Sequence, residues 1–132
     1  MSYAVNNSGR YMGYLILRRA LIIALVIELI TVLFRFGFDL QSTRDTGVIM
    51  APITFGLRIH HGYIGVVLVA VAIIFFRVKP RVYLWLVSLG LGLFISDMVH
   101  HFLVLYLTTG NPQFDTVYPS YSVIHCESKA VA

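Results

Sequence analysis

Residues 59–101 read IHHGYIGVVLVAVAIIFFRVKPRVYLWLVSLGLGLFISDMVHH. A short basic turn, RVKPR at 77–81, joins two long apolar runs, and a pair of adjacent histidines stands at the far end of each run. Proline ends one helix and readily starts the next, because its ring fixes the backbone and removes an N–H donor. The stretch therefore predicts a tight antiparallel hairpin of two apolar helices.

The rest of the chain extends this hairpin to three membrane helices. A membrane helix needs about 20 mostly apolar residues, and runs of this kind cover about 13–36, 53–76 and 82–107. We expect an all-α integral membrane protein with one domain over 1–132 and a polar tail at 108–132. The first run is expected to be a retained helix rather than a signal peptide, because Glu28 lies in its middle and no small-residue cleavage site follows it.

Composition supports this class and excludes others. The 132 residues are 58% hydrophobic and 12% charged, whereas soluble domains carry about 25% charged residues. Intrinsic disorder is excluded by the high hydrophobicity, and a disulfide scaffold is excluded because Cys126 is the only cysteine. The net charge of +4 does not indicate a nucleic-acid partner, since the basic residues cluster at the ends of the apolar runs.

The distribution of charge predicts an orientation. Six cations and no acids belong to the N-terminal segment and to the turn at 77–81; they are Arg10, Arg18, Arg19, Arg77, Lys79 and Arg81. Cytoplasmic segments are enriched in Lys and Arg. We therefore expect a multi-pass protein of the plasma membrane, with a cytoplasmic N-terminus and turn and an extracytoplasmic C-terminus.

The histidine pairs are expected to meet. His60 and His61 lie about 19 residues before the centre of the turn, and His100 and His101 lie about 21 residues after it. At 1.5 Å per residue both pairs would be about 30 Å from the turn. Asp97 precedes the second pair by three and four residues, so these three side chains share one helix face.

These five side chains form a candidate metal site. Its residues are His60, His61, Asp97, His100 and His101. Imidazole and carboxylate ligands suit zinc, copper(II), iron or nickel, and haem is a less favoured alternative. Adjacent helical residues diverge by about 100°, so one histidine of each pair is expected at a given centre. The alternative is a structural polar network in which Arg58 or Tyr63 pairs with Asp97.

Other polar groups have simpler interpretations. Glu28, with Thr31 and Arg35, forms a narrow polar stripe on the first helix, and we expect Glu28 to face protein because a charge is costly in lipid. The tail segment His125-Cys126-Glu127 offers possible ligands, and a solvated tail is the preferred interpretation. Small residues on the hairpin predict close helix packing; they are Gly62, Gly65, Ala70, Ala72, Gly90 and Gly92.

The hairpin also resembles small prokaryotic membrane proteins. They pair a His-His-x-x-x-Gly helix start with an Asp-x-x-His-His helix end, which correspond here to 60–65 and 97–101. The resemblance covers the hairpin only, and it implies a membrane hairpin with no assigned activity.

Three functions are compatible with this pattern. The first is a small subunit of a larger membrane complex, of metalloenzyme or respiratory type, in contact with lipid and with other membrane subunits that cover its polar stripes. The second is a free-standing metal-dependent membrane enzyme, with Asp97 as the obvious base, or a haem-binding cytochrome. The third is an oligomeric transporter or metal chaperone.

Overall fold

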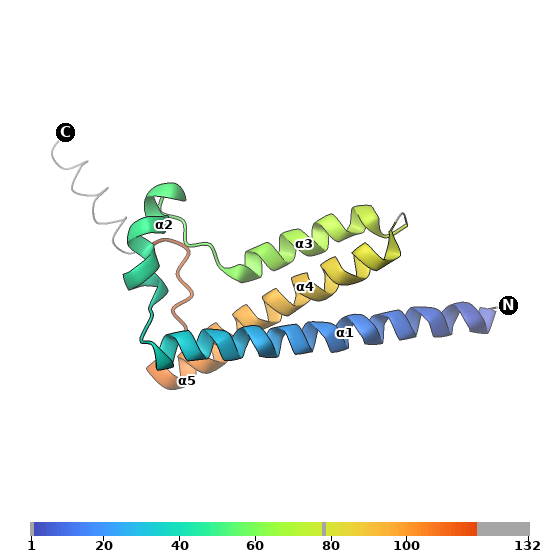
Figure 1. The fold of residues 1–132 in the computed structure, drawn as a ribbon, viewed down its shortest axis with the longest axis horizontal. Coiled ribbons are helices and arrows are strands. Elements are labelled where there is room, and N and C mark those ends of the chain that lie inside the picture. The colour runs from blue at the N-terminus through green and yellow to red at the C-terminus, as the bar shows by residue number, and fades with distance from the viewer. Residues whose placement is uncertain (1, 78, 119–132) are drawn as a thin grey trace.

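The computed structural model describes residues 2–77 and 79–118, and within these ranges every regular element is a helix (Figure 1). The α-helices, in chain order, are α1 (Ser2–Val32), α2 (Gly47–Ile53), α3 (His61–Phe75), α4 (Pro80–Val99) and α5 (Tyr106–Thr109). Three π-helical turns lie between or after them, at Leu33–Gly37, Ser42–Thr46 and His100–Leu105. The prediction of an all-helical fold is confirmed for the described residues.

Among the described residues, two continuous helical segments are long and apolar enough to cross a membrane. They are Gly9–Gly37, which is 29 residues long, and Pro80–Thr109, which is 30 residues long. α3 is apolar but has only 15 residues. At 1.5 Å per residue it is about 22 Å long, which is shorter than the hydrocarbon core of a bilayer, about 30 Å.

The predicted second helix is wrong at its beginning. The apolar run at 53–76 contains the end of α2 and a connection before α3 starts at His61. Phe55 and Gly56 have φ values of 54° and 82°, and these left-handed conformations cannot continue a right-handed helix. The connection at 54–60 therefore replaces about two turns of the expected helix.

α4 is the central helix of the structure. It packs along α3 on one side and along α1 on the other (Figure 1). The N-terminus and the α3–α4 turn lie at one end of the molecule, while α2, α5 and the connection at 54–60 lie at the other, which we call the histidine end. The antiparallel hairpin expected from the turn at 77–81 is thus present.

Small residues permit this close packing, as predicted, except that Ala70 is exposed. Gly65 on α3 and Gly90 on α4 lie opposite each other, and a Cβ on either would collide with the carbonyl oxygen of the other. A Cβ on Gly92 would lie 2.7 Å from Cγ2 of Ile23 on α1, beside Ala20, which is fully buried. Both helix pairs therefore meet backbone to backbone.

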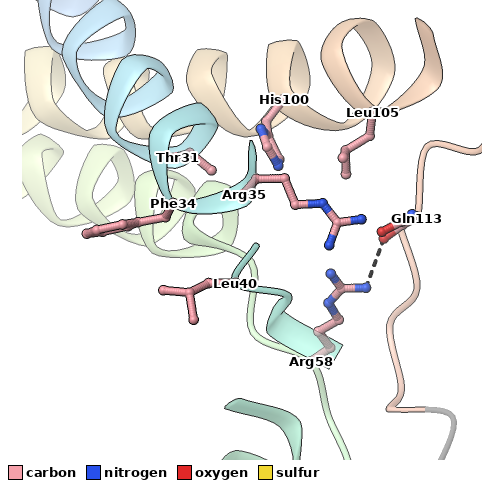
Figure 2. A pocket seen from close by; sticks show the side chains of 8 residues that line it. All are labelled: Thr31, Phe34, Arg35, Leu40, Arg58, His100, Leu105 and Gln113. Atoms are coloured by element: carbon pink, nitrogen blue, oxygen red, sulfur yellow. Dashed lines mark hydrogen bonds between the residues drawn. The ribbon is translucent and has the colours of Figure 1, made fainter. Parts of the chain in front are cut away.

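Residues 110–118 fold back over the histidine end. The backbone N–H of Arg58 donates to the carbonyl of Thr116 at 3.0 Å, and that of Tyr118 donates to the carbonyl of Gly56 at 2.9 Å. The Arg58 side chain also donates from Nη1 to the Gln113 carbonyl at 2.9 Å (Figure 2). Hydrogen bonds therefore hold this part of the tail against the connection at 54–60, over the ends of the helices.

The link between α1 and α2 is organised by one arginine. Arg44 forms ion pairs with Asp39 at 3.0 Å and with Asp45 at 2.9 Å. Hydrogen bonds from its guanidinium hold the pKa of both carboxyl groups below the ordinary value. The cluster is exposed to solvent and shapes the chain before α2.

Candidate metal centre

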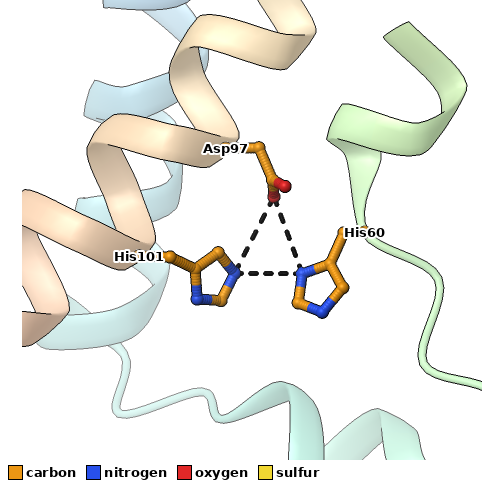
Figure 3. Close-up of side chains that lie close together, drawn as sticks. All are labelled: His60, Asp97 and His101. Carbon is orange, nitrogen blue, oxygen red and sulfur yellow. Dashed lines mark hydrogen bonds and ion pairs between the residues drawn. The ribbon is translucent and has the colours of Figure 1, made fainter. Parts of the chain in front are cut away.

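Three of the predicted ligands meet at the histidine end. His60 is the extended residue that precedes α3, Asp97 belongs to the last turn of α4, and His101 lies in the π-helical turn that follows (Figure 3). His60 Nδ1 is 3.1 Å from His101 Nε2, and each of these nitrogens is 3.7 Å from Asp97 Oδ1. All three side chains are buried.

The size of this triangle suits a metal ion. Ligand atoms about 2.1 Å from a tetrahedral zinc ion lie about 3.4 Å from one another. The three observed separations, 3.1, 3.7 and 3.7 Å, bracket that value. A metal ion could therefore contact all three ligand atoms with only small side-chain adjustments.

The positions of the imidazole protons are fixed by two backbone carbonyls. His101 Nδ1 is 2.7 Å from the Pro112 oxygen, and His60 Nε2 is 3.0 Å from the Asp115 oxygen. A carbonyl only accepts hydrogen bonds, so each of these nitrogens carries the proton. In neutral imidazoles the two remaining nitrogens, His60 Nδ1 and His101 Nε2, then present lone pairs to each other, and only a cation or an extra proton makes this contact favourable.

Asp97 adds a second requirement for a positive charge. Its side chain is 1% exposed, and neither carboxylate oxygen accepts a hydrogen bond from the described residues. A buried carboxylate without a partner is strongly unfavourable. Asp97 lies against the first turn of α3, since a Cβ on Gly62 would be 2.6 Å from Oδ2, and the dipole of that helix favours a negative charge there.

His61 stands beside the three ligands without joining them. Its Nδ1 is 3.3 Å from Asp97 Oδ1, while its Nε2 is buried and lacks a hydrogen-bond partner among the described residues. A cavity of about 140 Å³ opens in front of the cluster. Its lining includes all four paired histidines, Asp97 and Arg58. The cavity therefore adjoins the three ligand residues and His61 alike.

The structure places His100 elsewhere. Its Nδ1 lies 3.0 Å from Glu28 Oε1 on α1, and the Ser96 hydroxyl donates to Glu28 Oε2 at 3.4 Å. The prediction that Glu28 faces protein is confirmed, with His100 rather than Arg35 as its partner. The π-helical turn begins at His100, and two adjacent histidines consequently serve two different clusters.

The alternative pairing of Asp97 with Arg58 or Tyr63 is wrong. Arg58 instead contacts the Gln113 carbonyl and, at 3.8 Å, the carboxylate of Asp115. Among the described residues, the ion pairs of Asp97 are therefore all with histidines.

Sequence reasoning missed several residues of the centre. Phe114 stacks on His60 with ring centroids 4.5 Å apart and meets His101 edge-on at 5.1 Å. Gly62 was expected only as a packing residue, yet it makes room for Asp97. Its place directly after the first histidine pair was the available signal, whereas nothing marked Phe114 or the two tail carbonyls. His125, Cys126 and Glu127 lie outside the described residues.

Comparison with known proteins does not assign this centre. No protein-family model matches the chain, and neither the curated proteins nor the solved structures include a significant match. The function must therefore be inferred from the geometry of the chain itself.

Proposed function

We propose that the chain is a three-span membrane protein that binds a transition-metal ion through His60, Asp97 and His101. The observation that carries the proposal is the 3.1 Å contact between two imidazole nitrogens, each on a ring whose other nitrogen faces a carbonyl oxygen, beside a buried carboxylate without hydrogen bonds. A metal ion removes the unfavourable contact of both groups at once. An extra proton shared by the imidazoles is the competing explanation.

Exposed side chains support the membrane part of the proposal. α1, α3 and α4 all carry large apolar residues that are about half exposed or more, among them Leu25, Ile74 and Trp85. Lipid would cover these faces at no cost. α3 is too short to cross the hydrocarbon core alone, so the proposed span continues into the connection at 54–60, and the metal centre would lie slightly below the extracytoplasmic surface.

The ligand set favours zinc and would leave one coordination position open for water or substrate. Catalytic zinc sites use three protein ligands and keep the fourth position for water or substrate. The three ligands here line a cavity of about 140 Å³ together with His61. We therefore propose a metal-dependent hydrolytic or hydration reaction: His60, Asp97 and His101 would hold the ion, the ion would supply Lewis-acid activation of water, and His61 beside them would serve as the proton acceptor.

Haem fits these residues poorly. Cofactor pockets are usually about 300–1,000 Å³, and the cavity at the histidines is about 140 Å³. The two imidazole nitrogens are only 3.1 Å apart, which leaves no space for a porphyrin between them. A single metal ion remains the proposal.

Metal titration of paired histidine variants tests it. The purified chain, stripped with a chelator in detergent, should bind one equivalent of Co²⁺ with visible bands typical of a low-symmetry site, and Zn²⁺ should displace it. His101→Ala should abolish this binding, whereas His100→Gln, one residue away in the same turn, should retain it. Equal binding by both variants, or no stoichiometric binding by the folded wild-type chain, would favour the shared proton.

A second candidate is the membrane-complex subunit expected from the sequence. An apolar groove of about 230 Å³ runs over Gly65 and Gly90 on the hairpin, and membrane helices pack through such small residues. The sequence also suggested that other subunits cover the polar stripes of the chain. That argument is weaker now, because Glu28 pairs with His100 within the chain and leaves less polar surface for neighbours to cover. Native mass analysis in mild detergent separates the two, since a subunit would co-purify with other chains.

The proposed orientation has its own test. Cys126 is the only cysteine, so a membrane-impermeant maleimide should label it on intact cells. In the Cys126→Ser background, Lys79→Cys should react only after permeabilisation, because the α3–α4 turn is proposed to be cytoplasmic. The reverse pattern would invert the topology.

A further inference from the structure

A second polar cavity adjoins the metal centre. It measures about 160 Å³ and lies between the end of α1, the connection at 54–60 and the tail (Figure 2). Its polar lining includes Arg35, Arg58, His100 and Gln113. Arg58 and His100 also line the cavity in front of the metal ligands, so the two spaces are neighbours.

The charge in this cavity is strongly positive. Figure 2 shows the guanidinium groups of Arg35 and Arg58 directed toward the same space. Arg58 is 8% exposed, and its nearest carboxylate belongs to Asp115, whose side chain is 60% exposed and 3.8 Å away. The Arg35 side chain forms no hydrogen bond or ion pair with the described part of the chain. Two guanidinium groups thus line the cavity, and no carboxylate belongs to its lining. Three carboxylates lie outside it: Asp115 is 3.8 Å from Arg58, Glu28 pairs with His100, and the exposed Asp39 interacts with the charge of Arg35.

This arrangement calls for a negatively charged occupant. Like charges that face each other in a partly buried space are unfavourable, and an anion between them reverses the sign of the interaction. Guanidinium groups bind planar or tetrahedral oxyanions through two parallel N–H···O bonds.

We propose that the Arg35–Arg58 cavity binds a small oxyanion, namely a phosphate or carboxylate group. The volume matches this class of ligand, since about 160 Å³ equals roughly five waters at about 30 Å³ each. The oxyanion would lie beside the metal ligands, so the cavity deepens the proposed function by naming the substrate class. In that respect it rests on the proposed function, but anion binding itself needs no metal.

Calorimetric titration of the metal-free chain tests the proposal. The protein is purified in an uncharged, phosphorus-free detergent and titrated separately with inorganic phosphate, with acetate and with dihexanoyl phosphatidic acid. One saturable site is expected for at least one probe. Arg35→Gln should raise its Kd about tenfold or more, because a hydrogen bond to a charged group is lost.

Arg18→Gln is the matched control. Arg18 is an exposed arginine near the middle of the same continuous helical segment, 17 residues before Arg35, so its loss should leave the Kd within about twofold of wild type. Binding of phosphate or acetate would identify a free ion, whereas binding of the lipid alone would identify a phospholipid headgroup. Circular dichroism verifies that each variant is folded.

Two results would overturn the proposal. The first is the absence of saturable binding by all three probes to folded wild-type protein. The second is an equal loss of affinity in Arg35→Gln and Arg18→Gln, which would indicate general attraction to a basic chain. Because no metal is present in these titrations, either result leaves the metal-binding proposal standing, and a failed Co²⁺ titration would equally leave this one standing.

Discussion

Substitution of Gly62 by alanine should weaken metal binding without unfolding the chain. Gly62 is the second residue of α3, and the methyl group of Gly62→Ala would lie 2.6 Å from Asp97 Oδ2 and 3.1 Å from its Cγ. Alanine is the more favourable residue in a helix, by about 1 kcal/mol. The local backbone should therefore tolerate the change, and the carboxylate must move.

The size of that movement follows from the contact distance. Ordinary contacts to a Cβ begin at 3.4 Å, so Oδ2 must retreat by 3.4 − 2.6, or about 0.8 Å. Metal–ligand distances tolerate changes of about 0.2 Å. A carboxylate displaced four times as far loses its place in the centre, and affinity should fall by about 10–100-fold, as when a positioning group of a metal site is removed.

Competition titration with a chromophoric chelator measures this change. The Zn²⁺ affinity of Gly62→Ala should be compared with that of Gly13→Ala on α1, where an added Cβ meets nothing within 4 Å. Asp97→Asn provides the direct comparison, because it keeps the shape of the side chain and removes the charge. We expect Gly62→Ala and Asp97→Asn to be weak binders and Gly13→Ala to match wild type.

One outcome would refute the reasoning. If Gly62→Ala and Asp97→Asn bound Zn²⁺ as tightly as Gly13→Ala, Asp97 would not be a ligand, and its burial would need another explanation. If Gly62→Ala failed to fold, as judged by thermal unfolding, Asp97→Asn would still decide the question. A loss of affinity in Asp97→Asn alone would show that the carboxylate binds metal but can shift away from the new methyl group.

Three further changes test the surroundings of the centre. His100→Ala should lower the free energy of unfolding by about 3 kcal/mol in detergent denaturation, because Glu28 loses its partner in a buried setting. Phe114→Ala should lower the free energy of unfolding by about 1–2 kcal/mol, since it removes a ring stacked on a ligand imidazole. Arg44→Gln should raise the pKa of Asp45 toward 3.8, measured by NMR titration of the carboxyl group; the stabilisation present above that pH, and lost as the pH falls, should disappear.

The depth of the histidine pairs could be predicted because it depends on counting alone. A turn of five residues allows little slippage between antiparallel helices, so positions about 20 residues on either side must meet. His60 and His101 do meet, 3.1 Å apart. The same count could not reveal that α3 begins at His61, since it fixes depth and not helix ends; Pro52 and Gly56 are the residues that signal a break.

The direction of His100 could not be predicted for a different reason. Spacing of three and four residues places Asp97, His100 and His101 on one face of an ideal α-helix. The chain enters a π-helical turn at His100, and such turns often occur at functional sites because they change the direction of neighbouring side chains. Single-sequence patterns carry no reliable signal for this change, which sends His100 to Glu28 and His101 to the metal centre.

The tail determines which imidazole nitrogens of the metal centre carry a proton. It does so through backbone carbonyl groups, which no residue pattern in a sequence identifies. Pro112 and Asp115 contribute carbonyl oxygens, which every residue possesses, and these two carbonyls fix which nitrogen of His101 and His60 carries a proton. Without residues 110–118 folded over the histidine end, both imidazoles could choose the tautomer that lets one donate to the other, and the contact at 3.1 Å would be an ordinary hydrogen bond. The docked tail removes that choice. The requirement for a cation between the two histidines is therefore a property of the folded chain, and metal binding and tail docking should stabilise each other.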